Sequence, residues 1–171
     1  SRGNFALVWV QSKGMGMPEY SRWTVRSVEN WTGFAGELRA QTGLDVCYER
    51  PGGFHMALTA REWERRQGVM NRLTAQPDMP AVEIEMMEHA RVKAMLPAIG
   101  PEVVGASYCA LDGHCNSLRL LRALNQGMQM LGVTYLSDRP VERIEPSSGG
   151  FRFFTTAGEV RAAKVVLAAG I

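Results

Sequence analysis

The feature that most constrains the fold is the end of the chain, residues 164–171. A four-residue apolar run begins at Val165 and is followed by Ala169 and Gly170. Such a run is typical of a buried strand in a parallel sheet, and open α/β sheets bind ligands beyond the carboxyl ends of their strands. The sequence therefore predicts a buried strand over residues 164–168 that leads into a turn beside a ligand.

A complete domain rarely ends at such a strand, and the chain begins without methionine and enters an apolar segment at once. We therefore expect it to be the middle piece of a longer protein. Its 171 residues, 46% of them hydrophobic, are enough for about one folded domain. The 19 basic and 17 acidic side chains contain no run of five like charges, which argues against binding to nucleic acid or to an anionic membrane.

The densest basic cluster comprises Arg61, Arg65 and Arg66, with Glu62 and Glu64 interleaved. Because the two signs alternate, we expect this cluster to be the solvated face of a helix.

Three cysteines, at spacings that match neither a disulfide framework nor a CxxC metal site, favour a reducing compartment, and we expect a cytoplasmic protein. No apolar stretch approaches the ~20 residues of a membrane span, and no signal peptide is visible.

The helical patterns predict four helices. The first has its inward positions between Thr24 and Leu38 and ends at Gly43, and the second opens with a capping box, Thr59 to Glu62. A brief third helix runs through Val92 and Met95. The fourth begins after Asn116 and is expected to bury four residues: Leu121, Leu124, Met128 and Leu131.

The strand patterns complete a mixed α/β (α+β) fold. Extended segments are predicted at residues 45–50, 53–58, 82–85, 103–110, 141–145, 151–155, 159–161 and 164–168. The first two are expected to pair across a turn at Pro51 and Gly52.

Two short motifs leave alternatives open. Residues 112–116 place an aspartate, a histidine and a cysteine close together, which is compatible with a metal site or a Cys–His nucleophile, but a loop entering a helix is favoured. The pair Gly52 and Gly53 could let the backbone approach a ligand, but a turn between strands is favoured. Neither GxGxxG nor GxxxxGK[ST] occurs, so no phosphate-binding loop is predicted within this chain.

The order of the motifs carries more information than any one of them. These are, in order, Ser1-Arg2-Gly3-Asn4, a long helix, Gly52-Gly53-Phe54, Val104-Gly105-Ala106-Ser107, Asp112-Gly113-His114, Gly132-Val133, Pro140-Val141-Glu142-Arg143-Ile144 and Val165-Val166-Leu167-Ala168-Ala169-Gly170. Together they resemble the D-amino-acid oxidase family of FAD-dependent oxidoreductases. This family includes glycine oxidase, the sarcosine oxidase β subunit, opine oxidase and hydrogen cyanide synthase, and the resemblance covers essentially the whole chain.

The resemblance implies a two-domain flavoprotein. Residues 1–43 would supply an FAD-domain segment and the long helix, residues 44–115 substrate-domain-like elements, and residues 116–171 the return to the FAD domain. The N-terminal βαβ unit with GxGxxG and the C-terminal segment would lie outside this chain.

The resemblance also implies contacts to the cofactor FAD. The segment along the flavin is matched by Ser1, Asn4, Phe5 and Ala6. Val141 matches a position whose backbone contacts the adenine, and Ala169 with Gly170 matches the turn beside the adenosine. The arginine that holds the substrate carboxylate in this family is expected after Ile171. No catalytic residue and no metal ligand is therefore assigned.

The implied reaction is oxidation of glycine, sarcosine or a D-amino acid by hydride transfer to the flavin. The substrate would be a small amine or amino acid, and the fragment alone would be inactive. Relatives that act within multi-subunit complexes imply possible partner subunits, through which the protein could associate with a membrane. The alternative is a noncatalytic α+β interaction domain whose likeness to flavoenzymes is only architectural.

Overall fold

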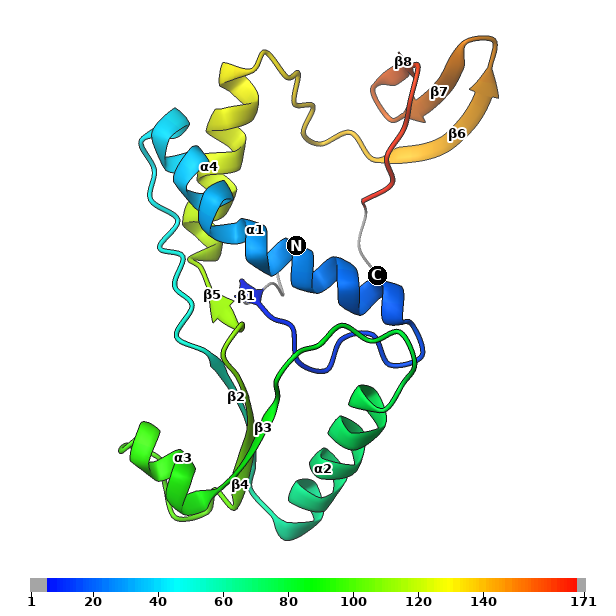
Figure 1. Cartoon of the computed structure of the whole chain (residues 1–171). Helices are drawn as coiled ribbons and strands as arrows, with labels where there is room; N and C mark the ends of the chain where they lie inside the picture. Colours follow the sequence, from blue (N-terminus) through cyan, green and yellow to red (C-terminus); the bar gives the residue numbers. More distant parts are fainter. Residues whose placement is uncertain (1–5, 169–171) are drawn as a thin grey trace. The chain divides into compact units, whose positions relative to one another are not determined.

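A computed structural model describes residues 6–168 of the chain. The described residues form two compact units, which we call the first unit (residues 6–127) and the second unit (residues 128–168). Helices and antiparallel strands occur together along the chain, which confirms the mixed α/β class (Figure 1). No helix in this part of the chain is both long and apolar enough to cross a membrane.

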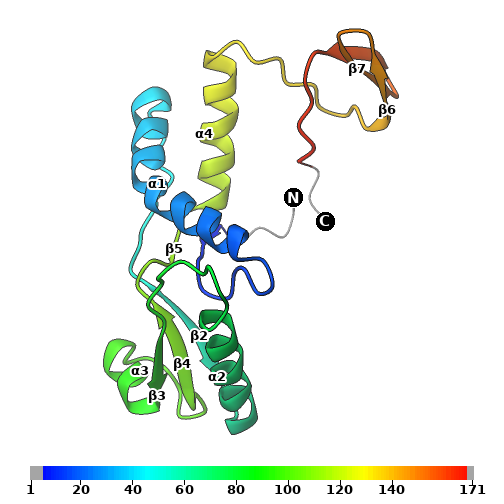
Figure 2. The same ribbon diagram turned by 45° about the vertical axis from the view of Figure 1, so that its right-hand side comes forward.

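The centre of the first unit is a three-stranded antiparallel sheet with the order β2 (Gly53–Ala57), β4 (Gly105–Cys109) and β3 (Glu85–Glu88). Helix α2 (Ala60–Thr74) and helix α3 (His89–Met95) lie on its two sides (Figures 1 and 2). The central strand is thus covered from both sides.

The alternation of β4 explains this arrangement. Ser107 points toward α2, where its hydroxyl meets Arg66, whereas Ala106 packs with Met87 and Val92 on the side of α3. Successive strand residues face opposite sides of a sheet, so a small apolar and a small polar residue serve two different layers.

Two strand predictions need correction. Residues 45–50 do not form a strand paired with β2; Cys47 has a φ of +51°, which interrupts the extended run, and only Glu49 makes a bridge, to His114. Strand β2 pairs with β4 instead. The strand expected at residues 82–85 begins at Glu85.

Helix α1 (Pro18–Thr42) ends as predicted at Gly43, which has a φ of +70° and donates its N–H to the carbonyl of Arg39. The capping box of α2 is also confirmed, because Thr59 accepts a hydrogen bond from the N–H of Glu62. These ends depend on residues that are neighbours in the sequence.

Helix α4 (Ser117–Met130) begins after Asn116, whose side chain accepts the N–H of Arg119 at 3.0 Å as predicted. In both ribbon views α4 lies beside α1 (Figures 1 and 2), and Ala123 packs with Leu38 and Val46. The helix therefore joins the core of the first unit through a small residue.

The predicted buried face of α4 is wrong. The structure buries Ala123 and Gly127, whereas Leu121 is 58% exposed and Leu131 is 76% exposed. Gly127 would bring a Cβ within 3.8 Å of the Thr42 methyl group, so the small residues mark the face that approaches α1. Because α4 lies close to α1, the face with small residues is the buried one. A pattern of large apolar residues does not indicate this face.

The second unit contains a meander of three antiparallel strands, β6 (Val141–Ser147), β7 (Gly150–Thr155) and β8 (Gly158–Ala162), as predicted. Gly149 (φ +89°) and Gly158 (φ +113°) provide the left-handed backbone at the two turns.

The strand predicted at residues 164–168 is absent. No strand within residues 6–168 pairs with this segment, and the side chains of Val166 and Leu167 are 88% and 77% exposed. A parallel strand needs neighbours in its own sheet, and the adjacent meander is antiparallel and ends at β8.

Candidate functional site

Strand β1 (Leu7–Val8) is the part of the first unit next to the residues expected to line the flavin. It pairs with β5 (Gly113–His114), and the carbonyl of Ala6 accepts the N–H of Cys115 at 3.0 Å. Ala6 is buried and has a φ of +56°, a backbone conformation unusual for a residue with a Cβ. The chain is thus bent sharply where β1 begins.

Asp112 holds the far end of this segment. Its carboxylate is fully buried and accepts hydrogen bonds from the backbone N–H of Val10 at 2.5 Å and from the side-chain amide of Gln11 at 2.8 Å. Burial raises the pKa of Asp112, and the hydrogen bonds from Val10 and Gln11 oppose this shift. The sequence favours a loop entering a helix at residues 112–116, and within this loop Asp112 holds the backbone of the segment after β1.

Gln11 links Asp112 to the sheet and is itself fully buried. Its amide nitrogen also donates to the carbonyl of Gly53 at 3.0 Å, and its amide oxygen accepts from Arg66 at 2.7 Å and from Ser107 at 2.6 Å. All four hydrogen-bonding positions of this amide are therefore used.

Arg66 reaches the same network from α2. Its guanidinium donates to the hydroxyl oxygens of Ser107 at 2.8 Å and Ser12 at 2.6 Å, in addition to Gln11. Burial lowers the pKa of Arg66, and the charge of Asp112 opposes this shift. The buried cation thus has hydrogen-bond partners and an opposite charge nearby, as buried charges require.

The prediction of a solvated basic face is wrong for Arg66, which is 7% exposed, although Arg61 and Arg65 are exposed. A signal was present in the sequence. Position 66 lies three residues after Trp63 and four before Met70, so it shares one face of the helix with these two apolar residues. The exposed basic residues around it made Arg66 look like part of a solvated face.

Gly52 and Gly53 pack against side chains of the same region. A Cβ on Gly53 would overlap the Trp9 ring, lying 2.6 Å from its Cη2 atom, and would lie 2.7 Å from the Cβ of Asp112. Gly52 has a φ of +88° and lies against the ring of Tyr108. The predicted turn between two strands is wrong, because β2 follows these glycines but residues 45–50 before them do not form a strand. The glycines are needed for close packing.

The alternative of a metal or a Cys–His site at residues 112–116 lacks support. Cys115 is buried, and burial raises the pKa of its thiol, which opposes formation of the reactive thiolate. His114 points to solvent. Within residues 6–168, no group of three His, Cys, Asp or Glu side chains could hold a metal ion.

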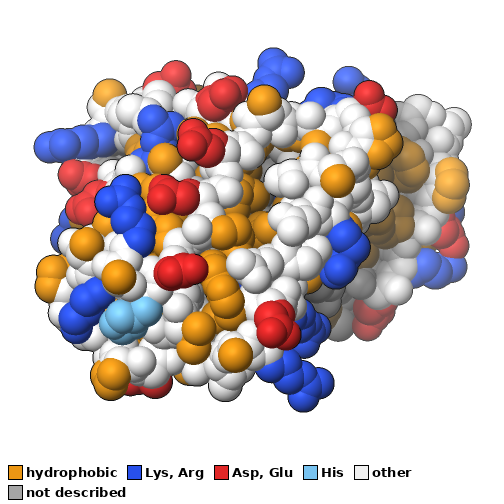
Figure 3. All heavy atoms as spheres, turned by 60° about the horizontal axis from the view of Figure 1, so that its bottom comes forward, with side chains coloured by type: hydrophobic (Ala, Val, Ile, Leu, Met, Phe, Trp, Pro, Cys, Tyr) orange, Lys and Arg blue, Asp and Glu red, His pale blue; other side chains and the backbone are white. Residues whose placement is uncertain are grey.

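A surface depression of about 440 Å³ lies between β1 and α1. It is lined mainly by aromatic and aliphatic side chains, with Leu7 and Trp9 from the β1 side and Tyr20, Trp23 and Trp31 from α1. Figure 3 looks onto the sheet end of the molecule and shows hydrophobic side chains between charged ones there as well. Apolar linings of this kind suit flat organic groups.

In the second unit, Val141 is the first residue of β6, an edge strand of the meander, and is 52% exposed. Ala6 and Val141 therefore belong to different units. The other five residues expected at the cofactor, Ser1, Asn4, Phe5, Ala169 and Gly170, lie outside the described residues.

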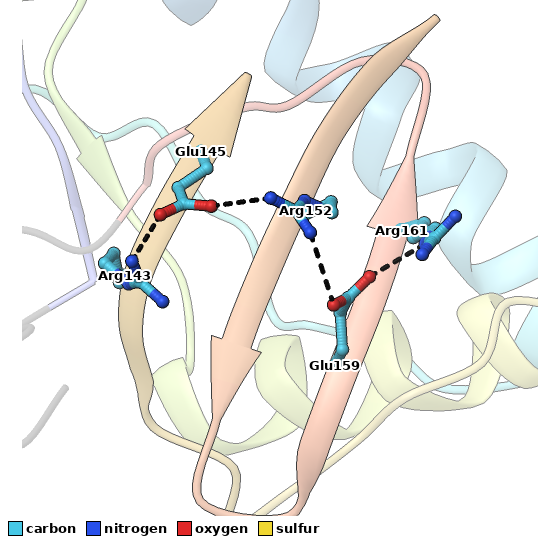
Figure 4. Close-up of polar contacts among 5 residues, drawn as sticks. All are labelled: Arg143, Glu145, Arg152, Glu159 and Arg161. Carbon is cyan, nitrogen blue, oxygen red and sulfur yellow. Dashed lines mark hydrogen bonds and ion pairs between the residues drawn. The ribbon is translucent and has the colours of Figure 1, made fainter. Parts of the chain in front are cut away.

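One face of the meander carries a ladder of five charged side chains (Figure 4). Arg152 contacts Glu145 at 2.8 Å and Glu159 at 3.9 Å, while Arg143 and Arg161 pair with these glutamates from the outer strands. Both glutamates thus have two cationic partners. The ladder offers no unpaired acidic group that could act as a base.

The family described as FAD dependent oxidoreductase matches residues 1–171. The chain belongs to this family of FAD dependent oxidoreductases. Its curated relatives include an opine oxidase subunit of Agrobacterium tumefaciens (strain Ach5), with 40% identity over all 171 residues, and glycine oxidase of Bacillus subtilis (strain 168), with 25% identity over 141 residues. The chain spans 46% and 36% of the lengths of these two relatives.

The structure of this FAD dependent oxidoreductase chain agrees with that grouping. It resembles glycine oxidase from Geobacillus kaustophilus, with a TM-score of 0.80 and 23% sequence identity, over 96% of this chain and 44% of the other. At this identity the likeness concerns the fold. The predicted family, fold class and cofactor type are confirmed.

The depression beside β1 has an apolar lining of the kind that suits the planar ring of a flavin. The hydrogen bond from Val10 to Asp112 holds the backbone just after β1. In the second unit, β6 has one backbone edge without a strand partner within residues 6–168.

Proposed function

We propose that the protein to which this chain belongs oxidises an amino acid or a related secondary amine with FAD. The observation that carries this proposal is the 40% identity to the opine oxidase polypeptide of Agrobacterium tumefaciens over the whole chain. Opines and glycine, after which two of the relatives are named, are both amino-acid amines. This supports donors of the CH–NH or CH–NH₂ type. The alternative of a noncatalytic domain with only architectural likeness does not account for identity at this level.

We assign the FAD contacts by the family resemblance. The flavin would lie along Ser1, Asn4, Phe5 and Ala6, with the adenosine end at Val141, Ala169 and Gly170. Leu7, the residue after the buried Ala6, is 56% exposed and Val141 is 52% exposed, which supports this assignment because each strand has a side chain that a ligand could cover.

When bound, FAD supplies the electron sink that accepts a hydride from the α-carbon of the amine. The residues of this chain would hold the backbone beside the ring in one position, and Leu7 and Trp9 would exclude water from it. The amine loses its hydride and a proton, and the imine so formed reacts with water. The arginine that holds the substrate carboxylate would follow residue 171.

The wider organisation is also a proposal. Two of the relatives are named as subunits of an opine oxidase, which supports a multi-subunit enzyme. The division into FAD-domain residues 1–43, substrate-domain residues 44–115 and FAD-domain residues 116–171 rests on the family resemblance.

The test uses the intact protein that contains this chain. After removal of free ligand, we expect a bound flavin spectrum, and anaerobic addition of an amine should bleach it. Glycine, sarcosine, a D-amino acid and an N-(carboxyalkyl) amino acid would be compared, with a hydroxy acid of similar size as control. A preparation that retains no FAD, or a flavin reduced by none of the amines, would contradict the proposal.

A further inference from the structure

The buried network connects one short stretch of chain to four other parts of the first unit. Gln11 contacts the Asp112 turn, β2 through Gly53, and both β4 and α2 through Ser107 and Arg66. These contacts bridge β1 and the β2-β4-β3 sheet, which share no strand pairing.

The network holds three consecutive residues after β1. Val10 donates its N–H to Asp112, Gln11 fills the centre, and Ser12, with a φ of +72°, is held by Arg66. A backbone bent at Ser12 and tied at each of these positions has little freedom to shift along the sheet. The position of β1 is therefore set by polar contacts as well as by packing.

We propose that Gln11, held between Asp112 and Arg66, is the positioning residue that sets where strand β1, next to the residues assigned to the flavin, lies relative to the β2-β4-β3 sheet. This inference rests on the proposed function, since it concerns the placement of a flavin. Gln11 acts through β1 and is not a catalytic residue.

The sharpest test is Gln11→Glu in the holoenzyme, because this change keeps the shape and replaces the amide donor by a carboxyl group. A protonated carboxyl has one donor where the amide has two, so it can donate to Asp112 but leaves the carbonyl of Gly53 without this partner. Once ionised, it faces the buried carboxylate of Asp112 on one side and the guanidinium of Arg66 on the other. We expect the rate of flavin reduction to be closest to the wild-type rate at acidic pH, and to fall between about tenfold and a hundredfold below it as pH rises.

The readouts are the rate of flavin reduction by the amine, the bound-flavin spectrum and the thermal midpoint, each measured at a series of pH values. The rate and the spectrum are recorded at a temperature well below the thermal midpoint. Gln126→Glu is the matched control, because Gln126 also donates to a carbonyl, that of Thr42, at 2.9 Å but lies in α4. The rate of flavin reduction in Gln126→Glu, divided by the wild-type rate, should not change with pH.

A purely structural role has a different signature. If Gln11→Glu lowers the thermal midpoint but leaves the spectrum and reduction rate of the folded holoenzyme at wild-type values at every pH, the inference is overturned. A wild-type protein without FAD would instead overturn the proposed function, and the inference with it.

Arg66 offers an independent arm. A depression of about 490 Å³ is lined by Arg66 and by other side chains of β2 and α2. Arg66→Ala should slow flavin reduction, and added methylguanidinium should restore part of the rate by occupying the vacated space. Arg65→Ala, which removes an exposed neighbour, should show neither effect. Unchanged reduction in Arg66→Ala would contradict the inference.

Discussion

Gly53 lies where β2, the Trp9 ring and the Asp112 turn meet. Gly53→Ala should destabilise the first unit by about 1–3 kcal/mol, because the new Cβ would overlap both Trp9 and Asp112. Urea unfolding of the two proteins measures the difference.

Gly33→Ala is the matched comparison. Gly33 lies within α1, and a Cβ there would meet no atom within 4 Å. Alanine in a helix interior is favoured over glycine, so this change should stabilise by roughly 0.5–1 kcal/mol. Equal effects of the two substitutions would show that packing at Gly53 is not the cause.

Asp112 should give the stability a recognisable pH dependence. Burial raises its pKa in the folded state above the unfolded value of 3.8, so the folded protein binds more protons between these two values. Stability therefore falls as pH rises from about 3.8 through the folded pKa, and levels off above it. We expect the difference in unfolding free energy between wild type and Asp112→Asn to shrink over this window.

Chemical unfolding at a series of pH values would show this trend. Glu37→Gln, which removes an exposed carboxylate of α1, reports the effect of losing one negative charge. A wild-type advantage over Asp112→Asn that grows with pH in the window would contradict the assigned shift.

At the scale of elements, the two faces of α4 differ sharply. Ala123 is fully buried against Leu38 and Val46, so Ala123→Leu should overpack the site and destabilise this chain by about 1–3 kcal/mol. Leu121→Gln should change stability by less than about 0.5 kcal/mol because Leu121 is mostly exposed. Thermal unfolding of both variants tests the assignment, and the reverse order of effects would restore the face predicted from sequence.

The same elements show what the sequence could predict. Helix ends at Gly43, Thr59 and Asn116 were correct because each depends on residues within one turn. Which strand pairs with β2, and whether residues 164–168 form a strand, depend on segments distant in the chain. Local sequence patterns do not indicate such pairings. At the site, the assignment of Ala6 to the flavin rests on resemblance and stays a prediction, whereas Gln11 and Arg66 were missed because their contacts exist only after several elements have packed together.

For the molecule as a whole, the segment between α4 and the meander is the most exposed connection. Every residue from 131 to 140 is exposed and none lies in a helix or strand. Chymotrypsin should cut first near Tyr135 and Leu136, since exposed irregular segments are preferred sites of proteolysis. Mass spectrometry of early products would identify the cut.

Trypsin provides the contrast, because the bond after Arg139 precedes Pro140 and resists this enzyme. First cleavage inside β6–β8 or α1 would show that the connection is protected. Early cleavage within residues 131–140 would show that the segment between the two units is accessible to the protease.

The contact between Val10 and Asp112 spans 102 positions of the chain. During synthesis, a nascent chain can place β1 only after the ribosome has released most of the first unit, since Asp112 and β5 come late in it and are followed only by α4. Contacts this distant in sequence form slowly. Until then, the aromatic side chains around β1 have no fixed neighbour, and chaperones that bind exposed apolar segments would find their target near the start of this chain.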